Sequence, residues 1–181
     1  MRKAAVSLIG VLCCTAILAL AHDPRTTAKD FSHGLKIEGA GDLNLSYKAM
    51  HFNVATYKRM QEDGQFRARM NSGVWSNIGA AEAGFDVVLG DQALPRGKYT
   101  LGLSIDAQDA FSVVFKGADK TVQAPMKVTS DNPEFPYLTF AIYPTDKPDI
   151  FVLEGRCGKY RGTVDLKVPY LAEHTHAAPK N

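Results

Sequence analysis

The histidines offer the sharpest chemistry in this 181-residue sequence. If a leader is removed after Ala21, the chain begins at His22, whose amino group and imidazole can chelate copper through two nitrogens. A third nitrogen would come from another histidine, and the candidates are His33, His51, His174 and His176. His174 and His176 lie on one side of an extended segment. A copper site built from His22, His174 and His176 is therefore one hypothesis, and incidental surface histidines are the favoured interpretation, because a closed site requires several fixed ligands.

Cys157 is the only thiol outside the first 21 residues, where Cys13 and Cys14 lie. A lone cysteine cannot form an internal disulfide, so the domain must be stabilised by an ordinary hydrophobic core. No histidine neighbours it in the sequence to activate a nucleophile. We therefore expect Cys157 to be a small buried residue in a turn-rich segment.

A candidate ligand-binding site consists of Trp75, Glu82 and Arg96. Trp75 is the only tryptophan and can stack on a sugar ring, although an aromatic residue in a strand-rich domain is more often part of the core. A carboxylate near a buried tryptophan pairs with a cation or faces solvent in a concavity, and the candidate partners of Glu82 are Arg67, Arg69 and Arg96. We expect Trp75 in the core and Glu82 as a partly buried polar partner.

Sequence motifs give little support to an enzyme. The chain contains no Gly-x-Ser-x-Gly elbow, His-Glu-x-x-His helix, phosphate loop or Gly-x-Gly-x-x-Gly fingerprint. Paired carboxylates for glycoside hydrolysis would need two acids in one cleft, and spacing alone cannot select a pair from 19 acidic residues. A non-catalytic role is favoured.

The first 21 residues predict a signal peptide. Arg2 and Lys3 form a positive start, residues 6–18 are nearly all apolar, and Ala19-Leu20-Ala21 matches the small-x-small cleavage pattern. An uncleaved anchor is the alternative, because residues 4–21 carry no charge and just reach the length of a membrane span. The sequence therefore predicts an exported protein, periplasmic or extracellular, with no membrane span after cleavage.

The charge balance argues against nucleic acid as a partner. The whole chain has 21 Lys and Arg against 19 Asp and Glu, and two of the basic residues lie in the leader, which leaves 19 against 19. Nucleic-acid binding by counterion release needs clustered basic side chains, and the body of the protein has no basic run.

Short segments with alternating hydrophobicity follow the leader. Apolar residues recur at every second position, the period that places one strand face in a core and the other in water. We expect eight or nine such strands, one of them over residues 122–128, with core positions that include Leu45, Val87, Leu101, Leu103, Val113, Phe115, Phe140 and Ile142. Hairpin-type turns separate them, and Gly97 closes one connection with a backbone angle that a Cβ would penalise. The pattern predicts an all-β, antiparallel two-sheet sandwich of jelly-roll-like type.

One segment departs from the strand pattern. Residues 54–70 place Val54, Tyr57, Met60 and Gln61 on one helical face, which Gly64 interrupts, so a short helix is expected there. The domain organisation that follows is a signal peptide over 1–21, a flexible arm over 22–35, the sandwich over 36–170 and a flexible tail over 171–181.

Two motifs resemble a known bacterial family. The segment Val74-Trp75-Ser76-Asn77-Ile78-Gly79-Ala80-Ala81-Glu82 and the hairpin Leu94-Pro95-Arg96-Gly97-Lys98-Tyr99-Thr100-Leu101 are similar to the Val-Trp-Arg-x-Gly-Ala-Asn-Glu and Leu-Pro-Ala-Gly-x-Tyr-x-Leu motifs of domain of unknown function 2911 (DUF2911). The resemblance covers residues 43–168. It implies an exported β-sandwich with no established activity. Ser76 and Ala81 depart from the family's Arg and Asn, which puts any polar site of that family in doubt here.

Together these features predict an exported bacterial β-sandwich that acts as a non-catalytic module, binding a small molecule, a glycan or an envelope protein through loops near Trp75 and Glu82. The alternative is a periplasmic copper-binding protein or hydrolase that uses His22. The prediction of an exported binding module rests on the hydrophobic alternation and the leader, and the copper alternative rests on the histidines.

Overall fold

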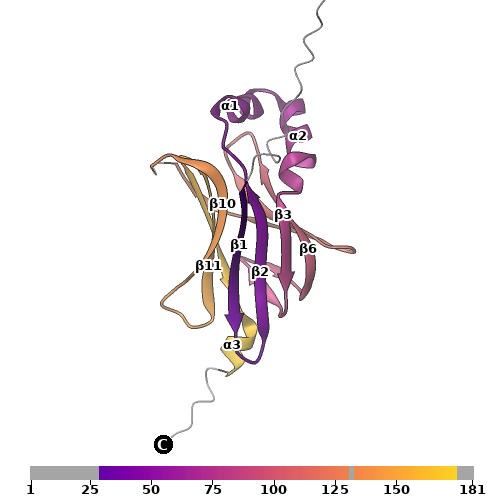
Figure 1. Ribbon diagram of the computed structural model, residues 1–181, viewed down its shortest axis with the longest axis vertical. Helices are drawn as coiled ribbons and strands as arrows, with labels where there is room; N and C mark the ends of the chain where they lie inside the picture. Colours follow the sequence, from indigo (N-terminus) through magenta and orange to yellow (C-terminus); the bar gives the residue numbers. More distant parts are fainter. Residues whose placement is uncertain (1–28, 131–132, 175–181) are drawn as a thin grey trace, which may run out of the picture.

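The computed structural model describes residues 29–130 and 133–174, which form two antiparallel sheets packed face to face with three short helices (Figure 1). Sheet I has the spatial order β1 (Lys29–Ile37), β2 (Gly41–Ala49), β3 (Gly79–Ala83), β6 (Gly97–Ile105), β7 (Phe111–Lys116) and β8 (Thr121–Pro125). Sheet II has the order β10 (Phe135–Pro144), β11 (Ile150–Gly158), β12 (Tyr160–Lys167), β4 (Val87–Leu89) and β5 (Gln92–Leu94), and β9 (Lys127–Thr129) also pairs with β12. The predicted all-β two-sheet sandwich is confirmed.

The core lies between the two sheets and follows the predicted alternation. Inward positions of β2, β6 and β7 are buried, while the positions between them are more exposed, except at Gly102 of β6, which lies against the backbone of Trp75 and Ser76. All eight core residues expected from the sequence are buried: Leu45, Val87, Leu101, Leu103, Val113, Phe115, Phe140 and Ile142. Gly97 has a φ of +155°, as its place in the turn predicts.

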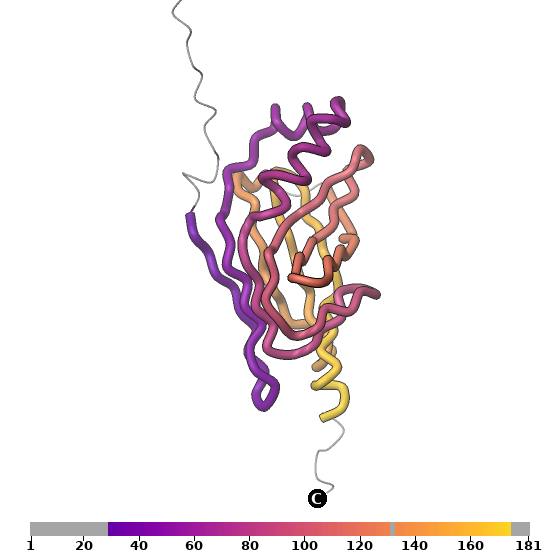
Figure 2. The backbone as a smooth tube through the Cα atoms, turned by 90° about the vertical axis from the view of Figure 1, so that its right-hand side faces the viewer, coloured from indigo at the N-terminus to yellow at the C-terminus, as the bar shows by residue number. Residues whose placement is uncertain are grey.

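Three boundaries differ from the sequence prediction. Residues 29–35, expected in a flexible arm, belong to β1, which pairs along its whole length with β2. The tail prediction from residue 171 is wrong for residues 171–174, which belong to α3 (Pro169–His174) at the end of the sandwich opposite the other helices (Figure 2). The apolar run 122–128, expected as one strand, splits at Met126 into β8 and β9 in different sheets. The hairpin with β2 decides the first boundary, and the pairing of β9 with the distant strand β12 decides the third.

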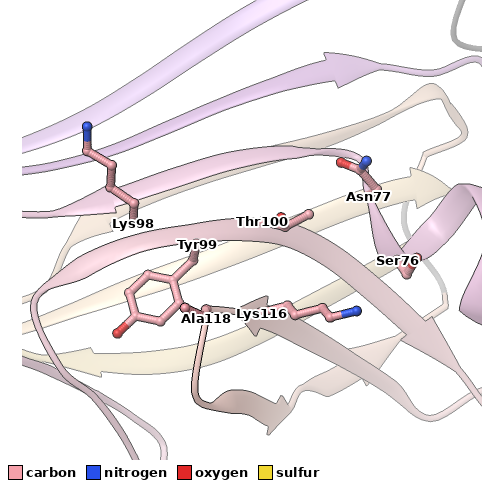
Figure 3. A pocket seen from close by; sticks show the side chains of 8 residues that line it. Ser76, Asn77, Lys98, Tyr99, Thr100, Lys116 and Ala118 are labelled. Carbon is pink, nitrogen blue, oxygen red and sulfur yellow. The ribbon is translucent and has the colours of Figure 1, made fainter.

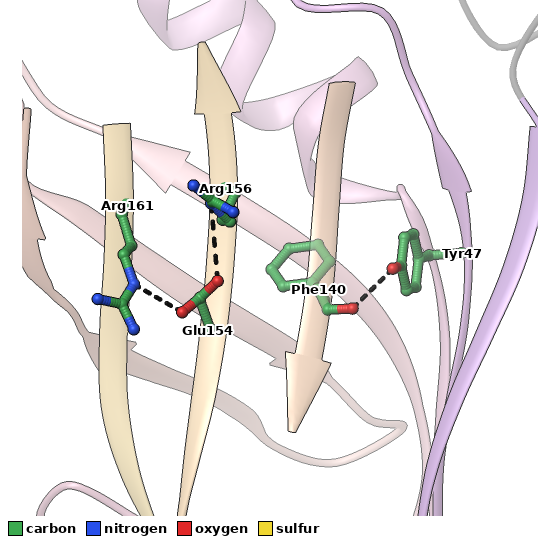
Figure 4. A network of polar contacts seen from close by, with 5 residues as sticks. All are labelled: Tyr47, Phe140, Glu154, Arg156 and Arg161. Carbon is green, nitrogen blue, oxygen red and sulfur yellow. Dashed lines mark hydrogen bonds and ion pairs between the residues drawn. The ribbon is translucent and has the colours of Figure 1, made fainter. Parts of the chain in front are cut away.

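The edge of β10 is covered by β2 and by the segment that follows it, residues 50–52. Phe52 donates its backbone N–H to the carbonyl of Pro136 (2.7 Å), and Leu138 donates to the carbonyl of Met50 (2.8 Å). Further along, the Tyr47 hydroxyl donates to the carbonyl of Phe140 over 2.6 Å (Figure 4). These bonds satisfy an edge that would otherwise be free to pair with another chain, and they hold the two sheets together at this corner.

Two helices follow β2 in place of the one expected helical segment. Asn53 caps α1 (Val54–Glu62) by accepting from the N–H of Thr56, and Asp63 caps α2 (Gly64–Ser72) by accepting from Gln65 and Phe66. Asp63 has extended dihedral angles, so the helical path breaks there, one residue before Gly64. The Asp63 carboxylate accepts hydrogen bonds from the backbone N–H groups of Phe66 and Gln65, and these bonds lower the pKa of Asp63 below its usual value.

Asn71 fixes α2 to the end of β6. Its side-chain amide donates to the carbonyl of Ile105 (2.8 Å) and accepts from the N–H of the same residue (3.2 Å). A helix η1 (Val74–Ser76) then leads into β3. α1 and α2 therefore cover one end of the sandwich as part of the packed structure (Figure 1).

No helix within residues 29–130 and 133–174 has the length and apolar character required to cross a membrane.

Candidate functional site

Trp75 is a core residue, as expected. Its side chain belongs to the buried hydrophobic cluster, and the residue is 7% exposed. Its backbone carbonyl lies so close to β6 that a Cβ added at Gly102 would stand 2.9 Å from it. An indole held in this way supports the packing of η1 on the sheet and offers no face for a ligand to stack on.

Glu82 differs from its prediction. It lies on the outer face of sheet I with its side chain 62% exposed, and its nearest ionic partner is Lys98 at 3.7 Å on the adjacent strand. The expectation of a partly buried residue paired with an arginine is wrong, because the register places Lys98 directly opposite it and leaves both in water. Pairs of this kind contribute little to stability.

The structure does not gather Trp75, Glu82 and Arg96 into one site. Trp75 lies beside Gly102 near the far end of β6, whereas Glu82 faces Lys98 near its start and Arg96 precedes the strand in an exposed turn. The backbone N–H of Arg96 donates to Asp86 over 2.7 Å, which anchors that turn. The three residues are therefore spread along a strand of nine residues.

The described histidines are likewise separate. The Nε2 of His33 lies 2.9 Å from the carbonyl of Ile142, His51 packs edge-on against Tyr137, and His174 stacks on Tyr170 in α3. Within residues 29–130 and 133–174, no group of three His, Cys, Asp or Glu side chains is placed to hold a metal ion. His22 and His176 lie outside the described residues, so a copper site that uses them stays a prediction.

Cys157 is buried, and its thiol has low reactivity. It lies on the inward face of β11 at 1% exposure, and burial raises the pKa of its thiol to about 12. A thiol with such a pKa is almost entirely protonated near neutral pH and is a poor nucleophile. The expected burial is confirmed, but the segment is not turn-rich, because Cys157 lies within strand β11.

Glu154 is a buried acid that the sequence did not single out. It lies on the outer face of β11 with its side chain 5% exposed, because the arginine side chains of the same sheet face cover it. Arg161 donates from Nε over 2.6 Å, and the Nε of Arg156 lies at 3.7 Å (Figure 4). Since both oxygens already face an arginine, we assign the cluster to the stability of sheet II.

An open hollow of about 590 Å³, which we call the outer-face hollow, lies on sheet I. It is lined by Ser76, Asn77, Lys98, Tyr99, Thr100, Lys116, Gly117 and Ala118 (Figure 3). Lys98 and Tyr99 point to opposite sides of β6, and the Tyr99 hydroxyl donates to the carbonyl of Pro95. The outer-face hollow is lined mainly by short polar side chains and lysines, as is typical of a sheet face exposed to water.

A second cavity, of about 480 Å³, lies at the end of the sandwich under α1, and we call it the helix-end pocket. α1 contributes one face, which consists of Val54, Tyr57, Lys58, Gln61 and Glu62. The opposite wall comes from the segment just before α1 and from three distant chain segments, and its residues are Phe52, Asp109, Glu134, Lys159 and Tyr160. Cavities of this size are typical of small-molecule sites.

Aromatic rings form the base of the helix-end pocket. The ring of Tyr57 lies 4.9 Å from that of Tyr160 and 5.5 Å from that of Phe52, and Phe111 packs behind at 5.5 Å from Tyr160. Gly158 has a φ of +55° and lies directly against the Phe52 ring, so a Cβ there would clash with it. Because Gly158 has no Cβ, the tight β11–β12 turn leaves room for the Phe52 ring next to Tyr57.

Tyr57 and Asp109 are the central polar pair. The Tyr57 hydroxyl donates a hydrogen bond to Oδ1 of Asp109, which has a left-handed φ of +59°. Asp106 holds that turn by accepting from the backbone N–H groups of Gln108 and Ala110. Burial, followed by the hydrogen bond to Asp109, raises the pKa of Tyr57 far above its usual value. The carboxylate of Asp109 is therefore oriented at the pocket wall and keeps accepting capacity at its other oxygen.

Gln61 carries a side-chain amide without a hydrogen-bond partner. Both its Nε2 and Oε1 are buried, and neither bonds to any described part of the chain. An unpartnered buried amide costs about 1–3 kcal/mol. This residue lines the helix-end pocket. Its amide can donate and accept hydrogen bonds with a bound molecule once the side chain turns toward it.

The sequence identified part of this pocket as a helical face. Val54, Tyr57 and Gln61 were expected on one side of the helix, together with Met60, which is fully buried beneath it. The periodicity could not reveal what lies opposite, because Asp109 and Tyr160 come from turns far along the chain. The missing information is the packing of those turns against α1.

No family model matches the chain, and comparison with curated proteins and with solved structures gave no significant match.

Proposed function

We propose that this protein is an exported, non-catalytic binding module whose ligand is a small molecule held in the helix-end pocket. The observation that carries the proposal is the combination, in one cavity, of an aromatic base, an oriented carboxylate and the unpartnered Gln61 amide. Ligand sites typically join an apolar wall to a few convergent polar groups. The proposal moves the predicted site from Trp75, Glu82 and Arg96 to the pocket under α1.

The test uses a matched pair of blocking substitutions. Val54 lines the helix-end pocket and is 60% exposed, so Val54→Trp adds bulk at its rim without disturbing the core. Ala118 is exposed and lines the outer-face hollow, so Ala118→Trp adds the same side chain at the competing region. Both variants should keep the wild-type melting temperature.

Saturation-transfer NMR on the chain that starts at His22 would screen a mixture of neutral, cationic and anionic small molecules. We expect hits that Val54→Trp abolishes and Ala118→Trp leaves intact. Hits lost only in Ala118→Trp would move the site to the outer-face hollow. An absence of any hit sensitive to Val54→Trp would refute the proposed function.

Export rests on the leader and has its own test. Replacing Ala19 and Ala21 with bulky residues should leave an uncleaved, membrane-held precursor, because the peptidase accepts only small side chains there. Mature protein of unchanged length would show that the assigned cleavage site is wrong. Membership of the DUF2911 family likewise stays a proposal that rests on the two sequence motifs.

A further inference from the structure

We infer that the ligand of the helix-end pocket is a neutral polyhydroxylated molecule of the size of a monosaccharide. This inference rests on the proposed function and narrows it to one chemical class. Three features of the pocket bear on it: the balance of charges, the hydrogen-bonding capacity of its polar groups and the state of its aromatic rings.

The charges disfavour an anion. Three carboxylates line the pocket against two lysines, and one of the lysines, Lys58, already pairs with Glu62 at 3.8 Å. A ligand carboxylate or phosphate would therefore meet a surplus of negative charge. The repulsion is moderate, because Glu62 and Glu134 are exposed to water, which screens their charges.

The rings disfavour a cation. The ammonium group of Lys159 lies 5.5 Å from the centre of the Tyr160 ring, where a bound ammonium group would otherwise sit. The surplus of carboxylates attracts cations to the pocket, but a cationic ligand on that ring would lie against the ammonium group of Lys159 and be repelled by it. The partly exposed rings of Phe52 and Tyr160 offer apolar surface to the C–H face of a sugar ring instead, whereas Tyr57 and Phe111 are buried.

The polar groups favour hydroxyls. Gln61 offers one amide that donates through Nε2 and accepts through Oε1, and the carboxylates only accept. A hydroxyl both donates and accepts, so a ligand rich in hydroxyls can bond to both kinds of group, whereas a quaternary ammonium forms no N–H or O–H hydrogen bond with either. Because the amide is buried, its contact with a ligand requires rotation of the Gln61 side chain, a low-cost motion for an unbranched residue.

The first experiment compares four probe classes by saturation-transfer NMR and calorimetry. The probes are neutral methyl glycosides of glucose, galactose and mannose, the anion glucuronate, the cation choline and a blocked alanine dipeptide. We expect at least one glycoside to bind the wild type and Val54→Trp to abolish that binding. The affinity for glucuronate should be at least tenfold lower than that for methyl glucoside. If only choline, glucuronate or the dipeptide binds and Val54→Trp abolishes it, the sugar class is wrong and the proposed function stands.

The second experiment substitutes the amide. Gln61→Leu keeps the size of the side chain and removes the unpartnered group, so it should raise the melting temperature while weakening glycoside binding by about three- to tenfold. Gln65→Leu on the exposed first turn of α2 is the control and should change neither. Unchanged binding in Gln61→Leu, or a lowered melting temperature, would overturn the role assigned to the amide, and no glycoside bound by the wild type would overturn the inference.

Discussion

The helix-end pocket and the outer-face hollow belong to the same sandwich but contain different kinds of side chain. The hollow lies on a sheet face, where strand alternation points short polar groups and lysines into water. The pocket lies where strands end, and its walls come from α1, two turns between strands and the segments next to β2 and β10. Rings and carboxylates from these segments converge there, whereas on the flat face they remain apart.

The difference shows how a sandwich acquires a binding site. Side chains on a sheet face stand nearly parallel to one another and enclose little space. At the end of the sandwich the connecting segments approach from several directions, and a covering helix closes one side. Binding residues are concentrated on such loops above a rigid scaffold.

The largest expected effect concerns Trp75, next to the outer-face hollow. Trp75→Ala should lower the free energy of unfolding by about 3–5 kcal/mol, because the buried indole is replaced by a cavity. Urea unfolding measures this effect, with Trp75→Phe as a milder control. Wild-type stability in Trp75→Ala would mean that the indole does not support the packing beside the hollow.

A smaller effect is expected at Tyr57 in the pocket. Tyr57→Phe removes the hydrogen bond to the Asp109 carboxylate and should cost about 1–2 kcal/mol. Tyr99→Phe is the matched change beside the hollow, where the hydroxyl bonds to an exposed carbonyl, and should cost less. Equal losses in the two variants would remove the energetic distinction between the regions.

The same tyrosine predicts a dependence on alkaline pH. Tyr57 has a raised pKa in the folded state, so above about pH 10, where the unfolded tyrosine ionises, the folded protein must retain a proton that the unfolded chain releases. Stability contributed by this proton is present below pH 10 and falls as the pH rises further. Urea unfolding at pH 9 and pH 11 should therefore show a smaller loss for Tyr57→Phe than for the wild type, and equal losses would contradict it.

The smallest effect belongs to Glu82, on the outer face of sheet I. Glu82→Gln should change the free energy of unfolding by less than about 0.5 kcal/mol, because both members of the pair with Lys98 are exposed. Thermal melting at low and high salt checks this. A loss of several kcal/mol would indicate that Glu82 is buried in solution.

Alternation in the sequence determined the fold class and much of the core. The period of two at Leu101, Leu103 and Phe115 has one physical explanation, a strand with one face in a hydrophobic core, and the structure bears it out. The helical face with Tyr57 and Gln61 was visible for the same reason, since a period of 3.6 places those residues together. The burial of Cys157 and Trp75 followed from their residue types.

Only the tertiary structure decided which side chains meet. The register of β3 with β6 placed Glu82 opposite an exposed lysine, and two arginines covered Glu154 on another sheet face. The packing of α1 against distant turns brought Asp109 and Tyr160 to Tyr57. Local patterns report how each segment is solvated, whereas a binding site depends on contacts between segments that are far apart in the chain, and those contacts are set by the packing of the whole domain.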